Sequence, residues 1–352
     1  MRSQCLAALA LVVISLLLPL SAGAQYYSTD YGTTAQSGSA VTTQETVRTA
    51  STVVSNLISS RIRGALSGRG TGVRRSAGGA TVESQSGLSG GGRGLMWGLW
   101  GSYSRNESEN DLPSTAFESD LDSFFGGIDV ALKDNVILGV AVGYEHNDIE
   151  TQFNAGEQDI DGYTIVPYLG IIVSRDHFSV GGNLSGGYSS LDISQFRTFN
   201  GARISSTLDS ERWFLAGNVN ATRPFGNWLF TGHGGLLWAE DEQDAFIESD
   251  GSAVAARATQ LGQVQLGGEV AYALDAWEPY ASATYAYDFE REKTVVSAGQ
   301  AQPANDRDDV LFGVGLRYFG DHGISGSLEF NAVTGREDFE SYSGTASIRV
   351  EF

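Results

Sequence analysis

The 352-residue sequence is poor in cysteine, methionine, proline and basic residues. Its only cysteine, Cys5, precedes the first apolar run, so the rest of the chain can form no disulfide and no cysteine-based metal site. Lysine and arginine number 22 against 42 aspartates and glutamates, which gives a formal net charge of -20. This balance argues against nucleic-acid binding, because phosphates are recognised by lysine and arginine.

After Leu20 the sequence also lacks any long apolar run. The positive start at Arg2, the apolar segment 6–20 and the small residues Ala22 and Ala24 are typical of a signal peptide. We therefore expect residues 1–24 to direct export and to be cleaved after Ala24. A transmembrane helix needs ~20 apolar residues, and nothing later approaches that length. The remaining classes are a soluble exported β protein and a membrane protein that crosses with strands.

Three segments follow the signal. Residues 25–41 are polar and rich in Ser, Thr, Gly and Tyr, and we expect a disordered tail. Residues 42–66 predict an amphipathic helix, because Thr42 and Glu45 fit a capping box and apolar residues recur at helical spacing. The apolar positions are Val47, Ala50, Val54, Leu57, Ile58, Ile62 and Ala65. Residues 67–93 are rich in Gly, Ser and Arg, which is typical of a flexible linker.

From residue 94 to 352 the spacing of apolar residues changes to that of strands. Large apolar residues alternate with small or polar ones, as in the segment 136–144. Aromatic residues on the apolar face recur ten apart in three pairs: Phe178 and Tyr188, Trp228 and Trp238, Trp277 and Tyr287. Ten tilted strand residues rise about 25 Å, the height of the apolar band of a membrane barrel between its aromatic girdles.

The connections alternate between tight turns and long acidic segments. The long segments are 106–119, 147–161, 190–206, 240–256, 289–309 and the shorter 335–340. Short turns on one side and long loops on the other are the arrangement of outer-membrane barrels. The sequence therefore predicts an all-β fold, a transmembrane antiparallel up-and-down β-barrel of about twelve strands, preceded by an amphipathic α-helix.

The last strand ends on a phenylalanine, with hydrophobic or small residues at every second position before it. Tyr342, Ile348, Val350 and Phe352 carry this pattern, which resembles the signal read by the barrel-assembly machinery. We therefore expect that machinery and periplasmic chaperones as partners. The alternative is a chain that simply stops at phenylalanine.

The order of helix, strands and terminal phenylalanine resembles the translocator domain of the classical autotransporters, a type V secretion family. Residues 98–103 (GLWGSY) resemble the family's first strand, and residues 277–285 (WEPYASATY) resemble its Pro-Tyr-Ala strand. The resemblance spans residues 42–352. It implies a barrel in the outer membrane of a Gram-negative bacterium, with the helix in the pore and a passenger outside. Residues 25–41 would then be a very short passenger, too short to fold alone.

Charged residues facing the lumen are the candidate functional residues. Strand alternation sends five acids inward: Asp129, Glu145, Glu269, Glu278 and Glu329. The helix carries Arg48, Arg61 and Arg63, and we expect arginine–carboxylate pairs to hold it in the pore. The alternative is that these acids line a water-filled channel.

No grouping of residues predicts catalysis, a cofactor or a metal site. His233 falls in a lumenal strand position, and His146 lies near the outer rim close to Asp148, as in a protease pair, but without a second group of defined role. The acidic run 240–244 lacks the spacing of a calcium loop. We expect solvated loop acids there, bridged loosely to lipopolysaccharide by divalent ions.

These features together predict a non-enzymatic barrel of the translocator type, with a helix that plugs its pore. We expect outer-membrane lipid and lipopolysaccharide around it and no nucleic-acid partner. The alternatives are an open diffusion channel or an adhesin-like surface barrel that acts through its acidic loops, and after these a barrel enzyme built on His146.

The barrel prediction can be checked on a denaturing gel. The exported protein should run faster unheated than boiled, because a closed barrel keeps its backbone hydrogen bonds paired and stays compact in detergent. Gel mobility before and after heating measures this. A mature protein that is soluble and monomeric without detergent would contradict the prediction.

Overall fold

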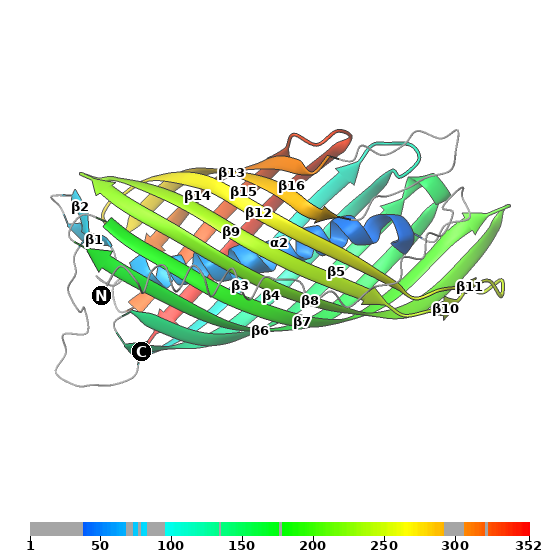
Figure 1. Cartoon of the computed structure of the whole chain (residues 1–352), viewed down its shortest axis with the longest axis horizontal. Coiled ribbons are helices and arrows are strands. Elements are labelled where there is room, and N and C mark those ends of the chain that lie inside the picture. Colours follow the sequence, from blue (N-terminus) through cyan, green and yellow to red (C-terminus); the bar gives the residue numbers. More distant parts are fainter. Residues whose placement is uncertain are drawn as a thin grey trace.

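The computed structural model shows a barrel that surrounds a helix (Figure 1). It describes residues 38–67, 73–76, 79–82, 96–133, 135–175, 178–291, 306–320 and 323–352. Helix α2 (Ser39–Ser67) runs along the lumen. Strands β1 (Val73–Ser76) and β2 (Gly79–Val82) pair with each other in the segment expected to be a linker. The expected signal peptide and the tail up to residue 37 lie outside the described residues.

Twelve antiparallel strands close the barrel, as predicted. Their bounds are β3 (Met96–Asn110), β4 (Phe117–Lys133), β5 (Val136–Thr151), β6 (Gly156–Arg175), β7 (Phe178–Phe199), β8 (Ala202–Phe225), β9 (Trp228–Gln243), β12 (Arg257–Tyr272), β13 (Trp277–Arg291), β14 (Asp308–Phe319), β15 (Ile324–Thr334) and β16 (Phe339–Glu351). A short pair, β10 (Phe246–Ile247) and β11 (Ala253–Val254), lies between β9 and β12. We call the end where β3 begins and β16 finishes the terminal end, and the opposite end the loop end.

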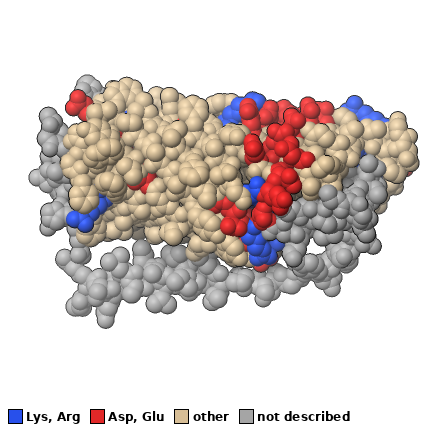
Figure 2. All heavy atoms as spheres, turned by 90° about the horizontal axis from the view of Figure 1, so that it is seen from above, with Lys and Arg blue, Asp and Glu red and all other residues tan. Residues whose placement is uncertain are grey.

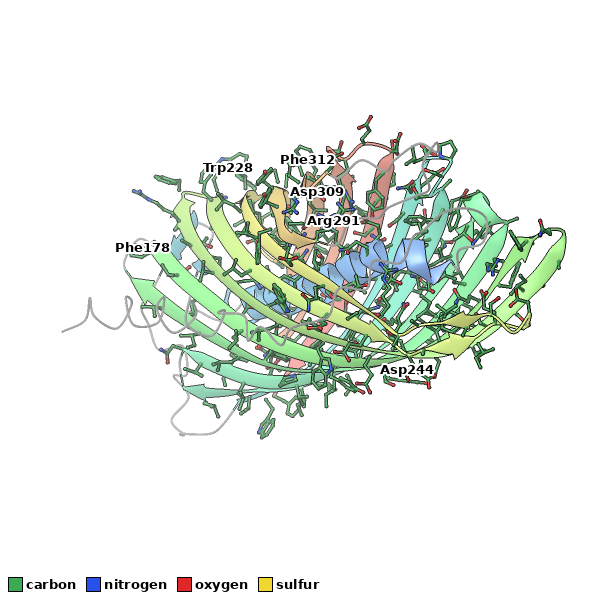
Figure 3. All side chains as sticks on the ribbon, turned by 45° about the vertical axis from the view of Figure 1, so that its right-hand side comes forward. Phe178, Trp228, Asp244, Arg291, Asp309 and Phe312 are labelled. Atoms are coloured by element: carbon green, nitrogen blue, oxygen red, sulfur yellow. The ribbon has the colours of Figure 1, made fainter. Side chains whose placement is uncertain are left out.

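The predicted alternation of faces is confirmed. In β5, Leu138 and Val142 are exposed on the outside, whereas Ile137 and Ala141 are buried inside. Phe312 of β14, labelled in Figure 3, is likewise exposed on the outer face. The barrel wall is one strand thick, so each strand needs an apolar outer face and an inner face that suits the lumen.

Two girdles of aromatic rings circle the outer surface. At the terminal end, Trp228 packs on Tyr272 and Trp277 packs on Tyr318. Figure 3 labels Phe178 and Trp228 at this end. Nearer the loop end, rings of neighbouring strands pair again: Tyr103 with Phe124, Tyr144 with Tyr163, Tyr188 with Trp213 and Trp238 with Phe289. These two levels mark the borders of the apolar band.

Three of the segments predicted as long loops, 106–119, 147–161 and 190–206, are mostly strand. Strands β7 and β8 continue their ladder until Phe199 pairs with Ala202, so the predicted loop 190–206 shrinks to the turn Asn200–Gly201. Both turn residues have positive φ, which asparagine and glycine tolerate and which suits a two-residue hairpin. The prediction was wrong because these extensions are polar on their outer face and resemble a loop in composition. Strands β7 and β8 therefore continue as paired strands beyond the outer girdle.

Helix α2 begins at Ser39 rather than Thr42 and ends at Ser67. Thr42 and Glu45 do not form the expected capping box, because their side chains bond to Gln158 of β6 and Arg291 of β13. The side-chain oxygen of Gln195 instead accepts a hydrogen bond from the Ser39 amide at 3.1 Å. The barrel thus caps the helix, which is why its first turn extends into the expected tail. No helix in the described part of the chain is long and apolar enough to cross a membrane.

Candidate functional site: the helix inside the barrel

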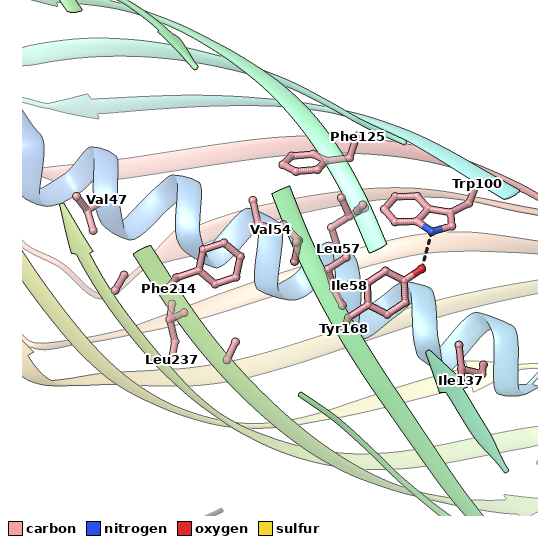
Figure 4. Packing of buried hydrophobic residues seen from close by; sticks show 14 of the residues in the cluster. Val47, Val54, Leu57, Ile58, Trp100, Phe125, Ile137, Tyr168, Phe214 and Leu237 are labelled. Atoms are coloured by element: carbon pink, nitrogen blue, oxygen red, sulfur yellow. Dashed lines mark hydrogen bonds between the residues drawn. The ribbon is translucent and has the colours of Figure 1, made fainter. Parts of the chain in front are cut away.

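The apolar stripe of α2 packs against one side of the lumen (Figure 4). Val47, Val54, Leu57 and Ile58 are buried in one cluster with inward-facing residues of the wall. The wall residues are Trp100, Phe125, Ile137, Ala141, Val166, Tyr168, Ile172, Phe214, Ala216, Leu237, Ala239 and Leu261. Full burial of one large aliphatic side chain stabilises by about 1.5–3 kcal/mol. This stripe therefore gives the helix a preferred side of the barrel.

Three glutamines of the wall hold the first turns of the helix. Gln158 donates to the Thr42 hydroxyl at 3.0 Å, and Gln243 donates to the Thr43 hydroxyl at 2.8 Å. Together with the cap from Gln195, these bonds satisfy polar groups that would otherwise be buried without partners. Sequence reasoning missed the glutamines because neutral polar residues facing a lumen carry no distinctive spacing.

Arg48 binds two acids of the wall. Its Nε lies 3.0 Å from Asp288 of β13, and its Nη2 lies 2.5 Å from Asp309 of β14. All three side chains are buried. Arg48 thus pairs with carboxylates of the wall as predicted, but with Asp288 and Asp309 and with none of the five predicted acids. Strand alternation could have identified Asp288, because an outward Tyr287 places the next residue inward. The segment after Tyr287 was assigned to a loop instead.

Glu45 makes the opposite pairing. Its carboxylate lies 2.6 Å from guanidinium nitrogens of both Arg291 and Arg336, beyond the outer girdle. Figure 3 labels Arg291 and Asp309 on the wall. Burial would raise the pKa of Glu45, but the positive charges of Arg336 and Arg291 outweigh burial and hold the pKa well below its usual range. Sequence reasoning assigned Glu45 to a helix cap, because an acid near the start of a helix is equally consistent with a cap and with a distant ion pair.

The five acids predicted to face the lumen do so. Asp129, Glu145, Glu269 and Glu278 are buried, and Glu329 is half-buried. Their partners among the described side chains belong to the wall. The pairs are Asp129 with Arg349 at 3.0 Å, Glu145 with Arg212 at 2.8 Å, Glu269 and Glu278 with Arg317 at 2.6 and 3.0 Å, and Glu329 with the Tyr280 hydroxyl.

The other two helix arginines cannot be placed in the same way. The side chains of Arg61 and Arg63 lie outside the described residues, so their pairing with lumenal acids stays a prediction. What the sequence reasoning overlooked is that the wall supplies its own inward arginines, Arg212, Arg317 and Arg349. Strand alternation applies to arginines as it does to acids, so assigning alternate residues to the inner face could have found these arginines too.

The other face of α2 borders a cavity of about 110 Å³. Thr49, Thr52, Asn56 and Ser60 of the helix line it on one side. Opposite them stand small polar residues of β3, β15 and β16: Ser104, Asn106, Ser327, Asn331, Ser341, Ser343, Thr345 and Ser347. A polar cavity of this size has room for several water molecules. The helix therefore lies off-centre, against β6–β9 and β12, and the cavity separates it from the opposite wall.

A belt of acidic side chains crosses the outer surface beyond the outer girdle (Figure 2). Within it, His146 of β5 lies 3.1 Å from Asp161, 3.4 Å from Asp148 and 3.7 Å from Asp159. Burial would lower the pKa of His146, but the hydrogen bond to Asp161 and the neighbouring carboxylates raise it. His146, Asp148 and Asp159 bring three potential metal-ligating atoms within 4.8 Å of one another. Only the pairing of β5 with β6 reveals this group.

The acidic run 240–244 is mostly strand and not a solvated loop. Asp241 is buried and pairs with Arg212 at 3.2 Å, whereas Glu240 and Glu242 lie on the other face of β9. The prediction was wrong for Asp241, because alternation continues through the run. His233 lies next to Thr284, 2.9 Å from its hydroxyl, in the lumenal position expected for it.

The four residues of the predicted assembly signal lie on the outer face of the last strand. Tyr342, Ile348, Val350 and Phe352 are exposed, and β16 pairs along its length with β3. The backbone of Phe352 exchanges two hydrogen bonds of 3.0 Å with Trp97. The terminal phenylalanine is thus held at the barrel seam with its ring outside.

The closed twelve-stranded barrel around an N-terminal helix agrees with a comparison of the sequence with known families. Residues 96–331 match the family model of the autotransporter beta-domain. The chain belongs to the autotransporter beta-domain family. Barrels of this family are translocator domains in the outer membrane of Gram-negative bacteria, as in type V secretion. No curated protein sequence matches the chain.

Three solved autotransporter structures share the fold. The translocator domain of NalP from Neisseria meningitidis has a TM-score of 0.64 at 13% identity, over 88% of this chain and 99% of its own. The beta domain of Bordetella BrkA has a TM-score of 0.54 at 16% identity, over 72% and 98%. The transport unit of AIDA-I from Escherichia coli has a TM-score of 0.54 at 14% identity, over 75% and 92%. At such identities the likeness concerns the fold alone.

Replacing Glu45 with glutamine should destabilise the docked helix by about 3 kcal/mol or more near neutral pH, because two guanidinium groups lose their charged partner. The lowered pKa of Glu45 contributes stability above the unfolded carboxyl value of about 4.3, and this contribution is lost as pH falls below it. The difference between Glu45→Gln and the parent should therefore shrink in acid.

Urea-induced release of the helix in detergent measures this, followed by a fluorophore on Thr49→Cys, which faces the cavity. The control is Glu290→Gln, the same charge change at an exposed position of β13. Equal effects of the two substitutions would show that Glu45 does not anchor the helix.

Proposed function

We propose that α2 plugs the pore of the finished translocator barrel and that the barrel acts without a chemical step. The observation that supports this is the double anchoring of the helix. Its apolar stripe is buried against the wall, and Glu45 and Arg48 form ion pairs of opposite sense with barrel residues. A slide of one helical turn, about 5.4 Å, would leave both buried charges without partners.

We further propose that residues 1–24 direct export and that the terminal end faces the periplasm. Short turns at the terminal end and long strand extensions at the loop end support this orientation. Lipid would then cover the band between the girdles. The acidic belt would meet lipopolysaccharide headgroups, with divalent ions between the two negative surfaces.

An open diffusion channel is the second candidate function. The cavity beside α2 favours it, because the cavity lies along the helix and polar side chains line much of it. The buried ion pairs of Glu45 and Arg48 hold the helix beside this cavity, however, and they support a plug over an open channel.

Deleting residues 25–93 should leave the barrel intact and raise its ion conductance several-fold. A helix is about 10 Å wide with its side chains, so its loss frees most of the lumen of a twelve-stranded barrel. Conductance in planar bilayers, compared with the undeleted mature chain, measures the change. The double change Glu45→Gln with Arg48→Met should raise conductance part of the way, and Glu290→Gln should not. Unchanged conductance after the deletion would rule out a plug.

We also propose that the barrel-assembly machinery and periplasmic chaperones deliver the barrel, through the outer face of β16. Phe352→Ser should then lower the amount of inserted barrel several-fold without affecting export. The exposed ring of Phe352 has no part in the core, so a loss of insertion would reflect recognition and not the packing of the folded barrel. Phe330→Ser on β15 is the matched control, since Phe330 is 64% exposed and Phe352 is 69% exposed. The heat-modifiable band in outer membranes measures insertion. Equal loss in both variants would contradict recognition of the terminal residue.

A further inference from the structure

The barrel closes where its first strand, β3, meets its last, β16. Their ladder runs from Gly98 opposite Glu351 to Asn110 opposite Phe339. All other neighbouring strands of the barrel follow each other along the chain. The seam is therefore the strand pairing that no hairpin or other local connection brings together, and it forms last in any order of folding that starts from hairpins.

A buried ion pair crosses this seam inside the lumen. Arg349 of β16 donates two hydrogen bonds to the carboxylate of Asp129 on β4, at 3.0 and 3.2 Å. Strand β3 lies between β16 and β4, so the pair reaches over β3. Arg349 is 8% exposed and Asp129 is 2% exposed. Separation of the pair would leave an uncompensated charge in a buried place.

Gly98 is the position on β3 over which the pair passes. It stands directly opposite Asp129 on one side and Glu351 on the other. A Cβ atom at Gly98 would lie 2.4 Å from Nη2 of Arg349 and 2.8 Å from an oxygen of Asp129. A side chain at this position would therefore push the pair apart, and three positions on three strands are matched to one another.

Two further hydrogen bonds and a second ion pair tie this pair into the wall. The Tyr168 hydroxyl of β6 donates to Asp129 at 3.0 Å, and the Trp100 indole of β3 donates to the Tyr168 hydroxyl at 2.9 Å (Figure 4). The Glu351 carboxylate forms an ion pair with Arg349, with an oxygen 2.6 Å from Nε. The last strand is thereby linked to β3, β4 and β6 through side chains as well as through its backbone.

The remaining lumenal ion pairs within the described wall do not cross the seam. Arg212 joins β8 to β5 and β9, and Arg317 joins β14 to β12 and β13. These pairs connect strands on one side of the seam, so none of them joins the last strand to the first two. The pair of Arg349 with Asp129 can form only after β16 has docked on β3.

We propose that Arg349, Asp129 and Gly98 form a closure lock, a lumenal ion pair over a glycine that holds the finished barrel shut at its seam. The last strand then has two separate roles on its two faces. Its outer face carries the residues proposed for assembly, and its inner face carries the lock. This inference is independent of the plug, because none of the three residues belongs to α2.

The test uses the full chain with Cys5→Ser, folded into detergent micelles. Two engineered cystines share one residue: Ser102 and Ser347 are opposite each other across the seam, and Ser327 and Ser347 are opposite each other in β15 and β16. Directly opposed strand positions lie within reach of a disulfide. Only the first cystine joins the last strand to the first strand across the seam, and so only it can replace the ion pair.

Arg349→Met should speed hydrogen exchange of the β16 amides by about a hundredfold or more and lower the temperature at which the compact gel band is lost. Gly98→Val should act in the same direction. The oxidised Ser102→Cys/Ser347→Cys pair should restore both properties, and the oxidised Ser327→Cys/Ser347→Cys pair should not. If Arg349→Met does not fold, the same comparison is made on refolding yield.

Three results would overturn the closure lock. Arg349→Met could behave like the parent, the seam cystine could fail to rescue it, or both cystines could rescue it equally. Arg317→Met serves as the matched control, because it removes a buried arginine of another lumenal network. Rescue of Arg317→Met by the seam cystine would also count against a role specific to the seam.

Discussion

Backbone pairing is the constraint on which the structure depends. A strand in lipid has no water to bond its N–H and C=O groups, so a sheet can cross only if it closes on itself. Pairing of β16 with β3 meets this condition. The alternating faces and the enclosed lumen follow from it, because a single closed wall has an outer face in lipid and an inner face that must be filled with polar groups, water or a helix.

The helix fills the lumen on one side only. Its apolar stripe is narrow, and the matching apolar patch of the wall covers β3–β6, β8, β9 and β12. The remaining wall carries small polar residues and borders the cavity beside the helix. Charge then sets the position along the axis, because Glu45 meets arginines and Arg48 meets aspartates near the same end of the helix. The apolar stripe therefore fixes the rotation of the helix about its own axis, and the ion pairs fix its position along the barrel axis.

Part of this site could be predicted from the sequence and part could not. Alternation placed the five lumenal acids correctly, since a strand's period fixes which face each residue takes. It did not reveal their partners, because Arg349 and Asp129 lie on strands that only closure brings near. Local composition misled twice. Polar strand extensions resembled loops, and Glu45 resembled a capping residue although two distant arginines bind it.

The sequence by itself determined the barrel class, the number of strands, the faces of the residues in the strands that it predicted, and the existence of the helix. All of these follow from short-range periodicity and from the limits that a membrane sets on strands. The tertiary structure alone decided where the helix begins, which side of the lumen it takes, and which charges meet. Those outcomes depend on contacts between residues hundreds of positions apart, such as Arg48 with Asp288, and no local pattern encodes such distances.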